Sequence, residues 1–311
     1  MENQAYMNGF LFLPFFAKSN YILYTICVFF FLYIFGVLIN AIIISVIYID
    51  YHLHTPMYVF ICNLAFVDIC YTTITVPNLL YMLLSGDNTV SFIQCFTQMY
   101  FHVLADSSEI YLIFIMAYDR YVAICDPLHY HTIFNRKHCL VLTSGTWISG
   151  SLNSLVLTIP ASHMSFCHSR TIHQFFCDPK ALINISCAGS EDVYIAIYLL
   201  VLIYGVLPIM FCVTSYIKII RVILQIKSKD GRKKAFSTCS SHLTVVSMFY
   251  ITALSVYMMP SSEYSNVLEP VFSIVYSIVT PMMNPLIYSL QNKEVKSAGQ
   301  RLLWGKQSIE Q

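Results

Sequence analysis

The stretch CVFFFLYIFGVLINAIII, residues 27–44, decides the class of fold. Its apolar side chains continue around every face of a helix. A helix needs about 20 mostly apolar residues to cross the roughly 30 Å of hydrocarbon in a bilayer. A membrane β-barrel would instead show segments of about ten residues in which polar and apolar side chains alternate. The stretch therefore predicts a membrane-spanning helix.

The composition of the whole chain extends this prediction. Of its 311 residues, 57% are hydrophobic and only 11% are charged, against about 25% charged in soluble proteins. Seven apolar stretches are long enough to cross a bilayer as helices, so we predict an all-α membrane protein: a seven-transmembrane helix bundle in one domain, residues 1–311. The predicted spans lie near residues 21–48, 57–84, 93–118, 139–160, 193–217, 243–260 and 270–290.

The distribution of the 17 Lys and Arg residues predicts the orientation. If residues 1–20 are extracellular, the outer segments contain only Lys18, Arg170 and Lys180, and the other basic residues lie at the inner ends of the spans. Basic residues concentrate on the cytoplasmic side of membrane proteins. We therefore expect a multi-pass plasma-membrane protein with an extracellular N-terminus and a cytoplasmic C-terminus. This distribution explains the basic residues without nucleic-acid binding.

The longest predicted outer loop, residues 161–192, contains three cysteines, and a fourth begins the third span. The four are Cys95, Cys167, Cys177 and Cys187. They lie where oxidation is favoured, but four cysteines allow three pairings and their spacing does not choose among them. The loop also contains Asn184 in an Asn-Ile-Ser triplet, a candidate glycosylation site.

Two inner segments have their own predicted structure. Residues 218–242 are basic, and we expect helix extensions that flank a turn at Asp230–Gly231. Residues 291–311 follow the last span and place Val295 and Leu302 among basic side chains. This pattern predicts a short amphipathic eighth helix at the inner membrane surface, followed by a tail.

The third span has an unusual row of polar side chains. Spacings of four, three, four, three and four residues place the row on one face of a helix, which must point into the bundle. The row consists of His102, Asp106, Glu109, Ile113, Met116 and Arg120. His102 and Asp106 are close enough to pair with each other. If Asp106 is instead ionised and free, it would attract a protonated amine that enters from outside.

Asp68 is the only charged residue of the second span, and Glu109 is a second carboxylate at a similar depth. Two nearby carboxylates need a cation or a shared proton to relieve their repulsion. A sodium ion is one candidate, with Asn40 and Asn284 as further oxygen ligands, and a hydrogen-bonded polar cluster without an ion is the alternative.

Asp68, Asp106 and Glu109 also define an alternative function, a transporter or ion pathway. Ile113 and Met116 would interrupt such a pathway with an apolar barrier before Arg120. The sequence has no nucleophile or cofactor motif, so we do not expect an enzyme.

Five motifs resemble, in order, those of the odorant receptors within the rhodopsin-like G-protein-coupled receptors. They are LHTPMY (53–58), MAYDRYVAIC (116–125), SY (215–216), KAFSTCSSHL (234–243) and PMMNPLIYSL (281–290). The resemblance covers almost the whole chain. It implies a receptor that binds a small odorant from outside and activates a heterotrimeric stimulatory G protein, which raises cyclic AMP. It also implies that Asp119 restrains Arg120 until the sixth helix moves outward.

The resemblance assigns further residues to roles. The predicted switch residues are Asp119, Arg120, Tyr121, Tyr216, Lys234, His242, Asn284, Pro285 and Tyr288. The predicted odorant site consists of His102, Val103, Asp106, Ser107, Leu200, Tyr204, Tyr250, Ala253 and Tyr257. The implied disulfides are Cys95–Cys177 and Cys167–Cys187. Asp106 departs from the small or neutral residue expected at its position, which argues against a neutral, apolar odorant and is consistent with a protonated amine as one candidate ligand.

Overall fold

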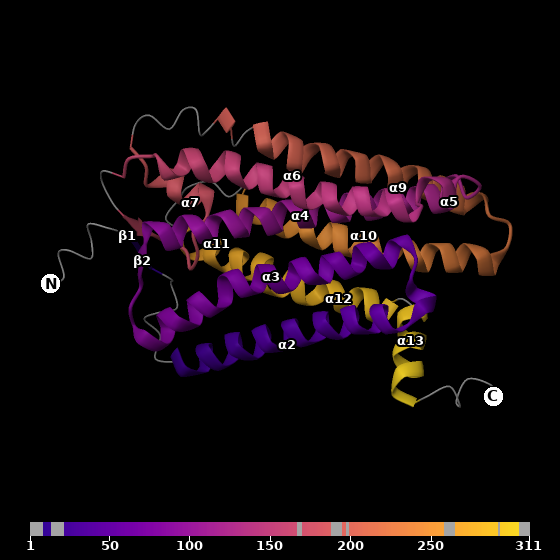
Figure 1. Ribbon diagram of the computed structural model, residues 1–311, viewed down its shortest axis with the longest axis horizontal. Helices are drawn as coiled ribbons and strands as arrows, with labels where there is room; N and C mark the ends of the chain where they lie inside the picture. The colour runs from indigo at the N-terminus through magenta and orange to yellow at the C-terminus, as the bar shows by residue number, and fades with distance from the viewer. Residues whose placement is uncertain are drawn as a thin grey trace.

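The computed structural model describes residues 9–13, 22–166, 170–187, 195–196, 199–257, 265–291 and 293–304. Within these residues, seven helical segments are long and apolar enough to cross a membrane. They lie side by side along the long axis of the molecule (Figure 1). The prediction of an all-α bundle with seven spans is therefore confirmed.

The spans have the following bounds. They are α2 (Ile22–Ile49), α3 (Pro56–Ser85), α4 (Phe92–Cys125), α6 (Arg136–Ser162), η3 with α9 (Val201–Val206, Leu207–Gln225), α10 (Lys229–Tyr257), and α11 with η4 and α12 (Ser265–Ile274, Val275–Val279, Thr280–Gln291). The short helix α13 (Lys293–Trp304) follows and lies across one end of the bundle (Figure 1). We call this end the α13 end.

The other end, here called the strand end, contains a small sheet. Among the described residues it has three strands in the order β2 (Thr89–Ser91), β1 (Gly9–Phe12) and β3 (Thr171–Ile172), with β1 antiparallel to β2 and parallel to β3. The disulfide Cys95–Cys177 joins the start of α4 to the segment that follows β3. Sheet and disulfide thus attach this segment to the bundle.

Helix α4 is the central helix of the bundle, because it packs against α3, α6, α9 and α10. A capping box starts it: the Ser91 side chain accepts from the Gln94 amide, and the Gln94 side chain accepts from the Ser91 amide. The helix continues to Cys125, beyond the predicted end at residue 118. The helix therefore includes Asp119 and Arg120, whose side chains pair with each other.

The inner connection 218–242 differs from the prediction. The chain turns at residues 226–228, between α9 and α10, and Asp230 and Gly231 belong to the first turn of α10. The Ser228 side chain accepts a hydrogen bond from the Gly231 amide at 3.3 Å. Ser228 thus acts as a helix start signal, and an Asp in the first turn is favoured there by the helix dipole. The predicted turn at Asp230–Gly231 is wrong for this reason.

The fifth and seventh spans each contain a π-helical segment, η3 (Val201–Val206) and η4 (Val275–Val279). Such segments shift the direction of the side chains that follow and are frequent at functional sites. Sequence periodicity assumes a regular helix and predicted neither of them.

Gly150 of α6 permits the close approach of α4. A Cβ atom at this position would lie 2.7 Å from Ser108 Oγ and 3.0 Å from the Leu104 carbonyl oxygen. We expect Gly150→Ala to lower the stability of the purified protein by about 1–3 kcal/mol, because these atoms must move apart. Gly145→Ala is the matched control on the same helix, since nothing lies within 4 Å of its Cβ. Thermal unfolding should show the control equal to or above wild type, and equal unfolding temperatures for the two variants would contradict this packing argument.

Candidate functional site

Asp106 lies inside the bundle and is bonded to the seventh span. The Tyr276 hydroxyl donates a hydrogen bond to Asp106 Oδ1, and η4 positions Tyr276 for this contact. Asp106 retains intermediate exposure, whereas Tyr276 is buried. Asp106 and His102 do not pair in the structure. Sequence reasoning missed Tyr276, because the shift in register within η4 changes which face of the span it occupies.

His102 is surrounded by aromatic rings. Its imidazole stacks on Phe176, with ring centroids 4.6 Å apart, and lies 4.7 Å from the ring of Tyr71. Tyr71 in turn contacts the ring of Tyr276 edge-on at 6.0 Å. His102 and Tyr71 are each 1% exposed, and neither His102 Nε2 nor the Tyr71 hydroxyl has a hydrogen-bond partner. The second, third and seventh spans thus meet around Asp106.

The structure separates the other predicted ligand residues into three groups. The hydroxyls of Ser107 and Tyr204 contact α6: Ser107 accepts from Asn153 at 2.6 Å, and Tyr204 donates to the Ser149 carbonyl at 3.0 Å. Val103 is buried in the apolar cluster at the strand end, and Leu200 packs against that cluster. Tyr250, Ala253 and Tyr257 lie on α10, and the buried Tyr250 hydroxyl has no partner.

The loop after the disulfide closes over the strand end of the bundle. Asp178 caps the short helix α7 (Pro179–Asn184) by accepting from the amides of Lys180 and Ala181. The Lys180 ammonium bonds Glu269 of α11 at 2.8 Å and the Val256 carbonyl of α10 at 3.0 Å. This pair connects the loop to the sixth and seventh spans.

Asp178 is 5% exposed, and burial raises the pKa of its carboxyl to about 6, although the amides of Ala181 and Lys180 oppose the shift. The folded protein therefore binds this proton more tightly than the unfolded chain does between about pH 4 and pH 6. The contribution of Asp178 to stability is present below pH 4 and is lost as the pH rises through 6.

Replacing Asp178 should reveal this pH dependence. We expect Asp178→Asn, which retains a capping side chain, to stabilise the protein at pH 7 by on the order of 2 kcal/mol and to have little effect at pH 4. Unfolding temperatures of the wild type and the variant across this range provide the measurement. A difference that stays constant with pH would contradict the assignment.

A second polar cluster lies toward the middle of the bundle. The Asn284 amide nitrogen donates to Asp68 Oδ1 at 3.2 Å, to Asp68 Oδ2 at 3.3 Å and to Glu109 Oε1 at 3.1 Å. Asn40 donates to the carbonyls of Gly36 and Pro281. Three spans thus meet at Asn284. The oxygens Asn40 Oδ1 and Asn284 Oδ1 are buried without a hydrogen-bond partner.

Between Glu109 and Arg120 the row on α4 is apolar. It consists there of Ile113 and Met116, which are both fully buried. At the α13 end, Arg120 Nε donates to Asp119 Oδ2 at 2.9 Å and Arg120 Nη2 contacts the same oxygen. The Tyr130 hydroxyl donates to Asp119 Oδ1 at 2.8 Å. The Asp119 side chain is 0% exposed. Both of its oxygens therefore accept hydrogen bonds away from solvent. Sequence reasoning missed Tyr130, which comes from the short helix α5 (Tyr130–Ile133).

The other predicted switch residues lie on α4, α9, α10 and α12. The Tyr216 hydroxyl and His242 Nδ1 are 2.5 Å apart and join α9 to α10. Tyr288 is buried with an unpaired hydroxyl, and Lys218 lies 5.5 Å from the ring centroid of Tyr121. Pro285 lies inside α12. The Lys234 side chain lies outside the described residues.

Helix α13 is held to the bundle by charged groups. The Arg301 guanidinium bonds Asp50 Oδ2 at 2.5 Å, and the Tyr58 hydroxyl donates to Glu294 at 2.7 Å. Burial alone would raise the pKa of Asp50, but hydrogen bonds from Arg301 and His52 outweigh it and hold the pKa at about 2. This pair is therefore charged throughout the physiological pH range.

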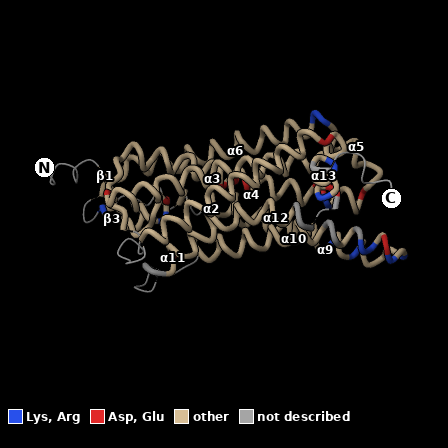
Figure 2. The backbone as a smooth tube through the Cα atoms, turned by 90° about the horizontal axis from the view of Figure 1, so that it is seen from below, with Lys and Arg blue, Asp and Glu red and all other residues tan. Residues whose placement is uncertain are grey.

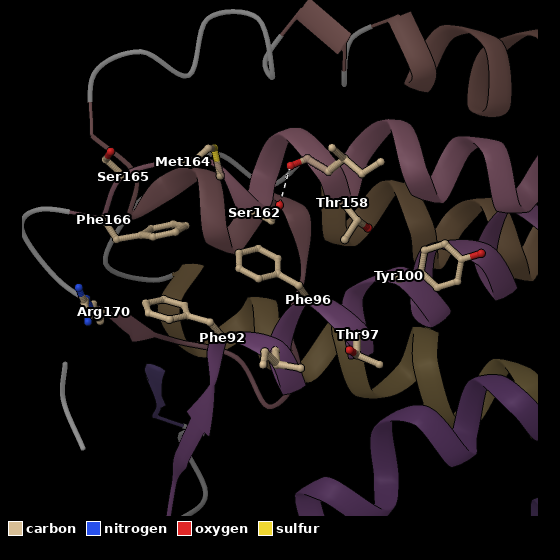
Figure 3. A pocket seen from close by; sticks show the side chains of 12 residues that line it. Phe92, Phe96, Thr97, Tyr100, Thr158, Ser162, Met164, Ser165, Phe166 and Arg170 are labelled. Carbon is tan, nitrogen blue, oxygen red and sulfur yellow. Dashed lines mark hydrogen bonds between the residues drawn. The ribbon is translucent and has the colours of Figure 1, made fainter. Parts of the chain in front are cut away.

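An apolar groove of about 840 Å³ lies between the strand-end halves of α4 and α6 (Figure 3). The rings of Phe92, Phe96 and Phe166 line it, with Arg170 at one end (Figure 3). Ile93 in its wall is 80% exposed, so the groove opens away from the bundle interior. None of the predicted ligand residues lines it, and the groove is distinct from the site around Asp106.

The remaining sequence predictions fall in the loop. Cys187 is disulfide-bonded, but Cys167 lies outside the described residues, so this pairing stays a prediction. Asn184 is exposed at the C-terminal end of α7, and its glycosylation also stays a prediction. Among the described residues, no cluster of three or more His, Cys, Asp or Glu side chains could hold a metal ion.

Comparison with known proteins agrees with this architecture. The family model described as "Olfactory receptor" matches residues 29–306. The chain is 40% identical to olfactory receptor 1 of Rattus norvegicus, covering 97% of this chain and 96% of that protein. It is 41% identical to olfactory receptor 13F1 of Homo sapiens, covering 97% and 94%.

The fold is also found among solved structures. A crystal structure of squid rhodopsin matches with a TM-score of 0.72 at 15% identity and covers 88% of this chain and 78% of that one. The sequence matches establish the family, and the match to this solved structure supports the seven-helix fold. The chain belongs to the olfactory receptor family of rhodopsin-like G-protein-coupled receptors, which are membrane receptors and not enzymes.

Proposed function

We propose that this receptor binds a small protonated amine at Asp106 and activates a stimulatory G protein, which raises cyclic AMP. The observation that carries the proposal is the position of Asp106: a residue of intermediate exposure inside the bundle, whose carboxylate is hydrogen-bonded to Tyr276. An ionised carboxylate accepts several hydrogen bonds, so one bond from Tyr276 leaves capacity for a ligand.

The charges around Asp106 favour a cation as that ligand. No ion pair of Asp106 with Lys, Arg or His occurs among the described residues. A desolvated carboxylate is stabilised strongly by a charge-assisted hydrogen bond from an ammonium group. At the strand end, Lys180 pairs with Glu269 and so does not neutralise the negative charge of Asp178. A cation would therefore be concentrated at the entrance.

The proposal places the strand end outside the cell. Basic residues lie mainly at the α13 end of the bundle (Figure 2), and such residues concentrate on the cytoplasmic side. The disulfide Cys95–Cys177 lies at the strand end, as expected for an oxidising exterior. Exposed Asn184 at the same end would be accessible for glycosylation. The receptor would then lie in the plasma membrane with its N-terminus extracellular.

The polar contacts suggest how ligand binding reaches the G protein. An amine at Asp106 would act on the Asp106–Tyr276 bond and so on the seventh span. This span also carries Asn284, which bonds Asp68 and Glu109. Activation would then release Arg120 from Asp119. A ligand must favour the active arrangement by about 5.5 kcal/mol to move the population from 1:99 to 99:1.

A sodium ion between Asp68 and Glu109 would stabilise the resting arrangement. The two carboxylates and the unpaired Asn284 Oδ1 are the oxygen ligands that a hard cation prefers. We expect replacement of K⁺ by Na⁺ at constant ionic strength to weaken the amine response about fivefold in the wild type. Glu109→Gln should abolish this ion dependence. Equal potency in both salts would leave a shared proton as the explanation of the pair.

A cyclic-AMP screen tests the proposed function. Cells that express the receptor and a stimulatory G protein receive small amines, carboxylic acids and neutral volatiles at matched concentrations. The expected result is that the active compounds are amines that are protonated at neutral pH. Activation only by acids or neutral compounds would overturn the amine proposal and leave the family assignment intact.

A further inference from the structure

Two polar atoms beside Asp106 are buried without partners. The Tyr71 hydroxyl on α3 and His102 Nε2 on α4 each have less than 1 Å² of accessible surface and no hydrogen bond. A buried polar group without a partner costs about 1–3 kcal/mol, so such groups usually satisfy their hydrogen-bonding capacity. Two of them whose rings lie 4.7 Å apart indicate a place where another polar group belongs.

Their position connects them to the proposed amine site. His102 precedes Asp106 by four residues, so it lies on the same face of α4 and about 6 Å closer to the strand end. Tyr71 lies between His102 and Tyr276, whose hydroxyl bonds Asp106. His102 therefore lies on the strand-end side of Asp106, and Tyr71 lies next to both His102 and Tyr276.

We propose that the ligand is an amino alcohol, whose hydroxyl bonds Tyr71 and His102 while its ammonium bonds Asp106. The inference rests on the proposed amine site and names the second half of that site. A hydroxyl both donates and accepts, so it suits the Tyr71 hydroxyl and either tautomer of His102. A carboxylate in the same place would be repelled by Asp106 and Asp178. Tyr71 and His102 are thus specificity-determining residues.

The spacing limits the length of the ligand. His102 and Asp106 are separated by about one helical turn, which is a rise of about 6 Å along the axis of α4. The nitrogen and oxygen of an extended amino alcohol of about four carbons are about as far apart as this rise along the helix. We therefore choose 4-amino-1-butanol as the probe, with 1-pentylamine, which has the same number of heavy atoms, as its matched analogue.

The experiment compares cyclic-AMP concentration–response curves for the two probes. Wild type should respond to 4-amino-1-butanol at a concentration about tenfold lower than to 1-pentylamine, as one good hydrogen bond allows. Tyr71→Phe and His102→Phe retain the aromatic ring and should each reduce this preference at least about threefold. The response of each variant to 1-pentylamine, which has no hydroxyl, is the reference for this ratio.

The control is Tyr100→Phe, which lies on α4 as His102 does. The Tyr100 hydroxyl contacts Ser151 of α6 at 2.8 Å and therefore belongs to another face. Its removal should leave the ratio of the two responses unchanged. Surface expression of Tyr71→Phe should equal wild type, because the lost hydroxyl had no partner.

Two results would overturn the inference, and they are distinguishable. If both amines activate but Tyr71→Phe and His102→Phe leave the ratio unchanged, water satisfies these atoms, and the amine proposal stands alone. If neither 4-amino-1-butanol nor 1-pentylamine activates while acids or neutral volatiles do, both the inference and the amine proposal are wrong.

Discussion

Asp106→Asn should raise the amine concentration needed for a half-maximal response at least about a hundredfold. The variant keeps the shape of the side chain and can still accept a hydrogen bond from Tyr276, so the bundle should fold. It loses the charge that an ammonium group pairs with, and loss of one partner of a desolvated charge pair costs about 2–5 kcal/mol. Cyclic-AMP concentration–response curves and surface labelling measure the two effects separately.

A matched control separates a direct contact from general attraction. Asp87 is an exposed carboxylate near the strand end, where it accepts hydrogen bonds from Thr89. Asp87→Asn removes the same charge outside the bundle and should change the response by less than about threefold. An Asp106→Asn receptor that responds to every active amine as the wild type does would show that Asp106 is not the anchor.

Arg120→Ala should abolish G-protein activation and preserve amine binding. Arg120 lies at the α13 end of α4, far along the helix from Asp106, and the proposed mechanism requires its release from Asp119. Binding is measurable in the purified receptor as an amine-dependent rise in unfolding temperature. The variant leaves buried Asp119 without its cation, although Tyr130 still donates to it. We therefore expect a lower unfolding temperature than wild type before amine is added.

Arg136→Ala is the control for this experiment. Arg136 is exposed at the start of α6, at the same end of the bundle. Its removal takes away one basic side chain and should leave signalling close to wild type. If Arg120→Ala signals as strongly as Arg136→Ala, the Asp119–Arg120 pair is not the switch.

The polar row on α4 shows what the spacing of residues in the sequence can predict and what it cannot. The spacing from His102 to Arg120 predicted one inward face, and the structure buries His102 and Glu109 among neighbouring spans. A regular helix fixes the direction of each of its own side chains. The spacing did not identify the partners, because Tyr276, Tyr71 and Asn284 come from other helices. His102 was close enough in sequence to pair with Asp106, yet in the structure Asp106 accepts a hydrogen bond from Tyr276.

The sequence by itself determined the class of the molecule. Apolar runs such as residues 27–44 can satisfy their backbone in a bilayer only as helices, and the five motifs identify the family. Only the tertiary structure decided which side chains meet. The π-helical segments η3 and η4 change the register of two spans, and packing within the bundle aims Tyr276 at Asp106 and Tyr204 at α6. These contacts depend on helices far apart in sequence, so no local pattern contains them.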